Sequence, residues 1–205
     1  MDGFNTDLHT QIELLEKILV SNEVLNKVFM RAQKLDLKNY YIGAGCIAQT
    51  VWNNHMKCDA LHGISDIDFV YYDSSDVSFE AENSTIEYIK NGIGPCPVKL
   101  DIKNQARVHV WYKEHFGYDI KPYMSIEEAV NTWPTTATSI GVRFENGTMK
   151  LYAPFGLNDL FGMIVRANKV QITEEIYTQK ADKWKAEWPA LTIIPWRADR
   201  KDIGL

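Results

Sequence analysis

Apolar residues in the first part of the chain recur mainly at steps of three and four residues. They are Ile12, Leu15, Leu19, Val24 and Val28. Because an α-helix turns once every 3.6 residues, this spacing places them on one face of a helix. The pattern predicts a helix over about residues 8–35, broken near Ser21-Asn22, that serves as scaffold.

The next segments alternate between strand and helix patterns. Short runs of β-branched and aromatic residues predict strands, and apolar residues at helical spacing predict helices. In chain order, we expect a strand over residues 40–42 that ends in Gly43-Ala44-Gly45, a helix over 46–56, a strand over 67–72, a helix over 79–90, a strand over 98–102 and a helix over 104–116. We expect the strands at 67–72 and 98–102 to pair.

Local signals organise the last third of the chain. Ser125 followed by Glu128 is typical of a capped helix start. Asn146-Gly147 predicts a two-residue turn that joins strands at 142–144 and 150–152. A helix over about residues 174–188 ends at Pro189. This order of elements indicates a mixed α/β or α+β fold, a small sheet flanked by helices.

Length and composition restrict the class of protein. The 205 residues are 45% hydrophobic and 24% charged, which suits one core, so we expect a single domain over residues 1–205. The sequence contains no signal-peptide pattern and no apolar run long enough to span a bilayer. Its three cysteines are widely spaced, which favours a reducing compartment. We therefore expect a soluble, cytoplasmic protein without membrane partners.

The charge balance argues against one function class. The formal net charge is -5, whereas sequence-independent binding of nucleic acid requires clustered Lys and Arg. We do not expect strong binding of that kind. A pocket for a magnesium-bound nucleotide does not require a basic surface.

Two acids stand at the start of the expected strand at 67–72. Residues two apart on a strand project to the same face, so Asp66 and Asp68 point together while Ile67 and Phe69 enter the core. Neighbouring carboxylates repel each other unless a cation lies between them. Magnesium prefers such hard oxygen ligands, with manganese as the alternative ion.

A third acid stands on the next strand. Asp101 lies between Leu100 and Ile102, and it completes a three-carboxylate set if the two strands pair. Asp-x-Asp also occurs often by chance. From the pattern alone, a metal site and a chance pair of acids both stay open.

The chemistry-bearing residues resemble a known superfamily. Gly43-Ala44-Gly45-Cys46, then Asp66-Ile67-Asp68, then Asp101 are similar to the polymerase-beta-type nucleotidyltransferase pattern. That pattern has a small-residue turn that opens a helix, a paired Asp on the next strand, and a third acid on a later strand. Cys46 stands where Ser is typical, and the gap between turn and pair is longer than usual.

Nearly the whole chain resembles the uncharacterised bacterial nucleotidyltransferase-like family of that superfamily. Five segments in one order carry the resemblance: Ala44-Gly45-Cys46-Ile47 with Val51-Trp52-Asn53, residues 63–71 around the acid pair, residues 103–109, Thr135-Thr136-Ala137-Thr138 before Gly141-Val142-Arg143, and residues 153–157 with Asp159-Leu160-Phe161. The resemblance implies a polymerase-beta-like nucleotidyltransferase fold.

The resemblance also implies a reaction. A nucleoside monophosphate passes from an NTP to an acceptor hydroxyl, and pyrophosphate leaves. Asp66 and Asp68 would hold the metal, and Asp101 would orient or deprotonate the acceptor beside a second metal. Gly43, Gly45 and Cys46 would form the phosphate-binding turn, because a helix N-terminus favours anions. The acceptor could be a small molecule, a protein or an RNA end.

Five further residues are candidates for nucleotide contact, each with an alternative. Lys103, Asn104 and Arg107 cluster on one side of the helix expected after Asp101 and could contact phosphate or acceptor. Asn104 could equally cap that helix, and Arg107 could pair with surface acids. Thr135 and Thr136 could bind base or ribose, or serve as ordinary β-branched residues at a strand entrance.

A second function hypothesis stays open at this point. The chain could be a catalytically inactive nucleotide-binding or interaction module that kept the fold and lost turnover. Cys46 in place of Ser motivates this reading, because a thiol is a weaker hydrogen-bond donor than a hydroxyl.

Overall fold

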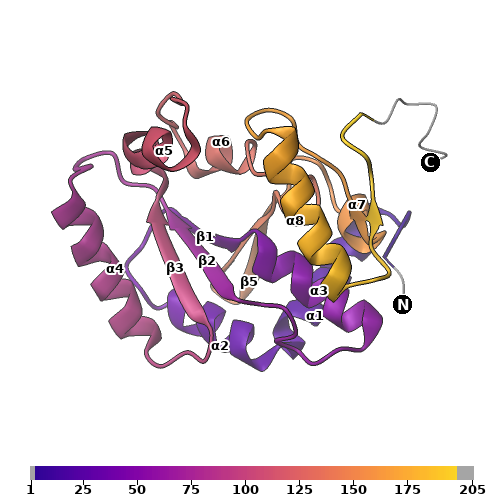
Figure 1. Cartoon of the computed structure of the whole chain (residues 1–205). Coiled ribbons are helices and arrows are strands. Elements are labelled where there is room, and N and C mark those ends of the chain that lie inside the picture. Colours follow the sequence, from indigo (N-terminus) through magenta and orange to yellow (C-terminus); the bar gives the residue numbers. More distant parts are fainter. Residues whose placement is uncertain (1–2, 198–205) are drawn as a thin grey trace.

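The fold is seen in a computed structural model that describes residues 3–197 (Figure 1). A five-stranded mixed sheet with the order β3-β2-β1-β4-β5 forms its centre. Its strands are β1 (Tyr40–Gly43), β2 (Asp66–Tyr71), β3 (Lys99–Asn104), β4 (Gly141–Glu145) and β5 (Thr148–Tyr152). β2 and β3 run parallel, and the other neighbours are antiparallel. The predicted pairing of the two acid-bearing strands is confirmed.

Helices cover both faces of this sheet. They are α1 (Leu8–Ser21), α2 (Glu23–Ala32), α3 (Gly45–Met56), α4 (Phe79–Ile93), α5 (Val108–Phe116), α6 (Ile126–Val130), α7 (Asn158–Phe161) and α8 (Glu174–Glu187). Figure 1 shows α1 and α2 below the sheet, α4 to the left of β3, and α5 and α6 above the sheet. Ile67 and Phe69 are fully buried in the main core, as predicted, whereas Tyr41 and Val70 pack against α6 on the other face.

The predicted break in the first helix is confirmed, and one residue makes it. The Asn22 backbone N–H donates to Leu19 O (3.3 Å), which ends α1. Its side-chain Oδ1 accepts from the Leu25 N–H (3.2 Å), which starts α2. Such a side chain satisfies a donor that the first helical turn leaves unpaired. Asn22 is therefore the C-cap of one helix and the N-cap of the next.

Two other local predictions are confirmed. The Ser125 hydroxyl accepts from the Glu128 N–H (3.1 Å) at the start of α6. In the hairpin of β4 and β5, Asn146 has a φ of 51° and Gly147 a φ of 76°, the left-handed backbone that a two-residue turn of this kind requires at both positions.

The helix expected over residues 104–116 begins later than predicted. Lys103 and Asn104 belong to β3, residues 105–107 form a single 3₁₀ turn, and α5 starts at Val108. The Asn104 N–H donates to Glu82 Oε1 (3.0 Å) and its side-chain amide donates to Asp73 O (2.7 Å). These distant partners hold the backbone extended, so the placement of Lys103 and Asn104 on a helix was wrong.

The C-terminal part adds elements that the pattern did not predict. β6 (Ile164–Val165) and β7 (Thr192–Ile193) form a small parallel pair. The predicted last helix is confirmed as α8, and its end is fixed by Trp188, whose ring N–H donates to Asn53 Oδ1 of α3 (2.7 Å). Within residues 3–197, no helix is long and apolar enough to cross a membrane.

Candidate active site

Strand register brings the three acids together. Asp68 pairs with Asp101 across the parallel strands β2 and β3, and Asp66 pairs with Lys99. Partners in register project to the same face of a sheet. On the other side of β2, Asp68 pairs with Gly43 of β1. The acids and the glycine turn therefore lie side by side.

A cleft of about 450 Å³ opens on this face. Its lining includes the three acids and residues from α3, α5 and α8. Of the residues predicted from the sequence, Gly45, Asp66, Asp68, Asp101 and Lys103 line it. Further lining residues that bear on its chemistry are Gln49, Trp111, Tyr112, Phe116, Tyr123, Trp133, Gln171, Lys180, Lys183 and Trp184.

Negative charge accumulates at Asp68. Burial of its carboxyl and, to a smaller extent, the neighbouring charges of Asp66 and Asp101 raise its pKa to about 7, while the charges of Lys180 and Lys103 act in the opposite direction. A carboxyl in such surroundings is costly to ionise without a cation. The site thus has excess negative charge where a metal ion would be stabilising.

Asp101 is engaged by lysines. The Lys103 ammonium donates to Asp101 Oδ1 (2.9 Å), and the Lys99 ammonium lies 3.8 Å from the same oxygen. Among residues 3–197, no three His, Cys, Asp or Glu side chains are grouped closely enough to hold a metal by themselves. The Asp66 and Asp68 pair nevertheless fits Mg²⁺, which commonly takes one or two carboxylates and completes its shell with water and phosphate oxygens.

In the turn before α3, Gly43 is closely packed, whereas Gly45 has free space beside its Cα atom. A Cβ on Gly43 would lie 2.4 Å from Ile140 O and 3.0 Å from the Trp133 ring. A Cβ on Gly45 would meet nothing closer than Gln49 Nε2 at 3.4 Å. Between them, Ala44 has a φ of 57°, a conformation that side chains rarely adopt and that costs energy. Gly43 is required by packing, whereas Gly45 leaves room in the cleft.

Cys46 does not face the cleft. Its thiol is buried and donates to Gly43 O (3.1 Å). Burial raises its pKa well above the ordinary value, and the charges of Asp68 and Asp66 add to this. The thiol therefore stays protonated, and the part of the residue available to a ligand is its backbone N–H.

The other residues of the β3 to α5 segment separate in space. Lys103 projects to the cleft face, whereas Asn104 alternates to the core face and is buried. Arg107 donates to Val77 O (2.9 Å) and forms an ion pair with Glu82. It lines a neighbouring hollow that also touches Asp101 and Lys103. Asn104 and Arg107 thus lie outside the main cleft.

Thr135 and Thr136 also have internal partners. The hydroxyl of fully buried Thr135 lies 2.7 Å from that of Thr138. The Thr136 hydroxyl donates to Asp159 Oδ2 (2.6 Å), which in turn accepts from Arg166. Neither of the two threonines lines the cleft, although Thr138 does.

The sequence pattern did not predict that residues of α8 line the cleft. Ile176, Lys180, Lys183 and Trp184 line the cleft at steps of four, three and one along this helix. Helical spacing signals that such residues share a face. It does not signal which other element that face meets.

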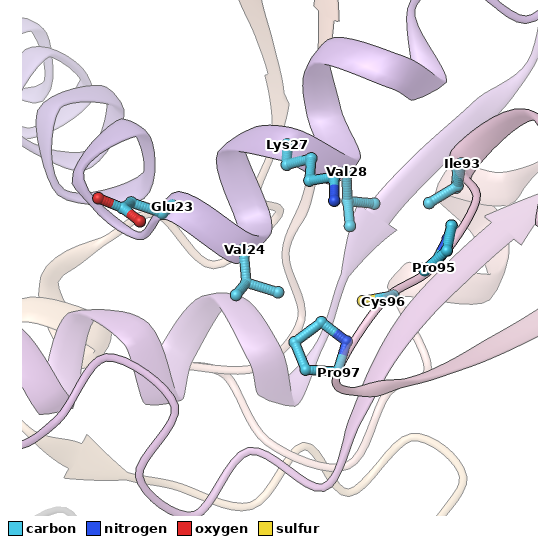
Figure 2. A pocket seen from close by; sticks show the side chains of 8 residues that line it. All are labelled: Glu23, Val24, Lys27, Val28, Ile93, Pro95, Cys96 and Pro97. Atoms are coloured by element: carbon cyan, nitrogen blue, oxygen red, sulfur yellow. The ribbon is translucent and has the colours of Figure 1, made fainter.

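A second hollow of about 320 Å³ lies between α2 and the segment that joins α4 to β3 (Figure 2). It is lined by Glu23, Val24, Lys27, Val28, Ile93, Pro95, Cys96 and Pro97. None of the residues predicted for the site is among them. This hollow is thus separate from the candidate site.

The fold and the paired acids define a nucleotidyltransferase-type domain. The structure is similar to a solved structure described as revealing a CCA-adding enzyme head domain, with a TM-score of 0.69 and 22% sequence identity, covering 88% of this chain and 95% of that one. A profile of the nucleotidyltransferase family matches residues 30–193. The chain belongs to that family, as the sequence resemblance implied. No curated protein that was compared matches the chain significantly.

Proposed function

We propose that the protein transfers a nucleoside monophosphate from an NTP to an acceptor hydroxyl with the help of Mg²⁺ or Mn²⁺. The observation that carries the proposal is the register of β2 and β3, which sets Asp68 beside Asp101 on the cleft face. Membership of the nucleotidyltransferase family supports the transferase class. The acceptor is a small molecule, a protein or an RNA end.

In this proposal the acids have separate roles. Asp66 and Asp68 hold the metal, which would neutralise charge on the triphosphate oxygens when bound. Asp101 orients the acceptor hydroxyl and accepts its proton as the acceptor oxygen attacks the α-phosphorus. The new oxygen–phosphorus bond forms as the bond to pyrophosphate breaks. Lys103 fixes the Asp101 carboxylate through their 2.9 Å hydrogen bond.

The turn at the start of α3 supplies phosphate contacts in this proposal. The first N–H groups of a helix have no partner within the helix and attract anions. Gly45 lines the cleft without a side chain, so a phosphate oxygen can approach the N–H groups of Gly45 and Cys46. The Cys46 thiol itself makes no contribution, because it donates to Gly43 O.

Calorimetric titration tests the proposal. ATP, GTP, CTP and UTP are titrated with Mg²⁺ into the wild-type chain and into Asp66→Asn and Asp68→Asn. At least one nucleotide should bind the wild type, and both variants should lose metal-dependent binding. Wild-type chain that binds none of the four, with a Tm unmoved by nucleotide and Mg²⁺, would contradict the proposal.

A nucleotide-binding module without turnover is the second candidate. The buried Cys46 thiol and the engagement of Asp101 by two lysines support it. This candidate requires Mg²⁺-dependent NTP binding without pyrophosphate release across an acceptor library. It also requires that Asp101→Asn binds NTP like the wild type.

We further propose that the protein works in a reducing compartment such as the cytoplasm. Cys46, Cys58 and Cys96 are all free thiols. Proteins of oxidising compartments more often pair their cysteines. Mass spectrometry of the chain purified under alkylating conditions should find three unpaired thiols.

A further inference from the structure

Helix α8 presents two lysines to the cleft on a fixed support. Lys180 and Lys183 line the cleft, while Tyr177, Ala181 and Trp184 on the same helix are buried. The Trp184 ring packs against the Trp52 ring of α3, with centroids 5.7 Å apart. The position of the lysines relative to the start of α3 is therefore set by core packing.

These two lysines differ from the other basic groups near the acids. Lys103 pairs with Asp101, and Arg107 pairs with Glu82. Within residues 3–197, neither Lys180 nor Lys183 forms an ion pair with a carboxylate. Lys180 nevertheless attracts the Asp68 carboxylate across the cleft. Two cations thus stand exposed, without a carboxylate of their own, opposite the acids.

We propose that Lys180 and Lys183 bind the triphosphate of the nucleotide from the α8 side of the cleft. This inference rests on the proposed function. The sequence assigned phosphate contacts to Asn104 and Arg107, but both have protein partners. The inference assigns these contacts instead to α8, about 75 residues further along the chain. A triphosphate that enters a cleft with three acids requires cations besides the metal. Lysine binds phosphate as a point charge.

Titration of inorganic tripolyphosphate tests this inference. It is titrated with Mg²⁺ into the wild type, Lys180→Ala, Lys183→Ala and Lys180→Arg, alongside an NTP and the matching nucleoside. Each alanine variant should weaken tripolyphosphate and NTP binding by about tenfold, the effect of losing one charged hydrogen bond. Nucleoside binding should not change, and arginine should restore most of the affinity. Lys17→Ala, an exposed mid-helix lysine on α1, is the matched control.

The outcomes separate this inference from the proposed function. If the wild type binds NTP and both alanine variants bind tripolyphosphate as tightly as the wild type does, the inference is wrong and the proposed function stands. If the wild type binds tripolyphosphate but no NTP, the proposed function fails, and the assignment of the two lysines to a nucleotide triphosphate fails with it. Equal losses in Lys17→Ala would show a net-charge effect and overturn the inference. A wild type that binds neither ligand overturns both.

Discussion

Single glycines at the turn before α3 have different physical roles. Gly43 lies against Ile140 O and the Trp133 ring, whereas Gly45 borders the open cleft. The same substitution therefore affects stability at one position and ligand access at the other.

Gly43→Ala should destabilise the fold by about 1–3 kcal/mol, because the added methyl group meets backbone that cannot move cheaply. Gly45→Ala should leave Tm unchanged or slightly higher, since Ala favours helix over Gly by up to about 1 kcal/mol. It should nevertheless weaken NTP binding by narrowing the approach to the helix N-terminus. Thermal unfolding and calorimetry check the pair. A Gly45→Ala variant with wild-type affinity would contradict the proposed phosphate contact.

Asp68 predicts a pH effect in the metal-free chain. Its pKa is about 7 in the folded state against 3.8 for the ordinary side chain. Between these values the folded state binds more protons than the unfolded state, so stability should fall as pH rises from about 4 to about 7. Tm measured in EDTA should show this fall, and Asp68→Asn should reduce it. Asp59→Asn, at an exposed position, is the control and should show the same fall as the wild type. If Asp68→Asn shows a fall as large as that of the wild type, Asp68 is not its source.

At the scale of elements, the buried side chain of Asn53 links α3 by a hydrogen bond to Trp188, the residue that follows α8. Asn53 of α3 accepts from the Trp188 ring N–H (2.7 Å) and donates to His62 O (2.8 Å). The second bond fixes the segment that leads into β2 and its acids. Asn53 thus connects the two helices that border the cleft.

Asn53→Ala should lower the free energy of unfolding by about 1–3 kcal/mol, because it leaves buried polar groups without partners. Urea denaturation measures the loss. Exposed Asn54→Ala is the matched control and should remain near the wild-type value. Equal stability of the two variants would show that the Asn53 bonds contribute little.

At the scale of the whole molecule, the N-terminal helices lie mostly outside the segment matched by the family profile. That segment starts at residue 30, yet Leu15 and Leu19 of α1 are fully buried in the main core together with residues of α3 and α8. α1 and α2 are therefore part of the same packing unit as the site.

The single domain expected from composition stays a prediction that unfolding can test. If residues 1–205 share one core, tryptophan fluorescence and far-UV circular dichroism should give coincident urea transitions. Among the six tryptophans, Trp52 reports on α3, Trp111 on α5 and Trp184 on α8. Two separated transitions would indicate independently folding parts.

Much of the fold follows from local signals. The strand and helix order, the break at Asn22, the cap at Ser125 and the turn at Asn146-Gly147 each depend on neighbours within a few residues. The start of α5 does not, because Asn104 is held extended by Glu82 and Asp73 from elsewhere in the chain. Local patterns fail where a distant partner satisfies the backbone.

The sequence by itself determined the acid pair and its face, because alternation along a strand sends Asp66 and Asp68 one way and Ile67 the other. Only the tertiary structure decided what surrounds them. The register of β2 and β3 sets Asp101 beside Asp68, and core packing sets Lys180 and Lys183 across the cleft. Periodicity fixes the direction of a side chain relative to its own element, whereas its neighbours depend on contacts between elements far apart in the chain.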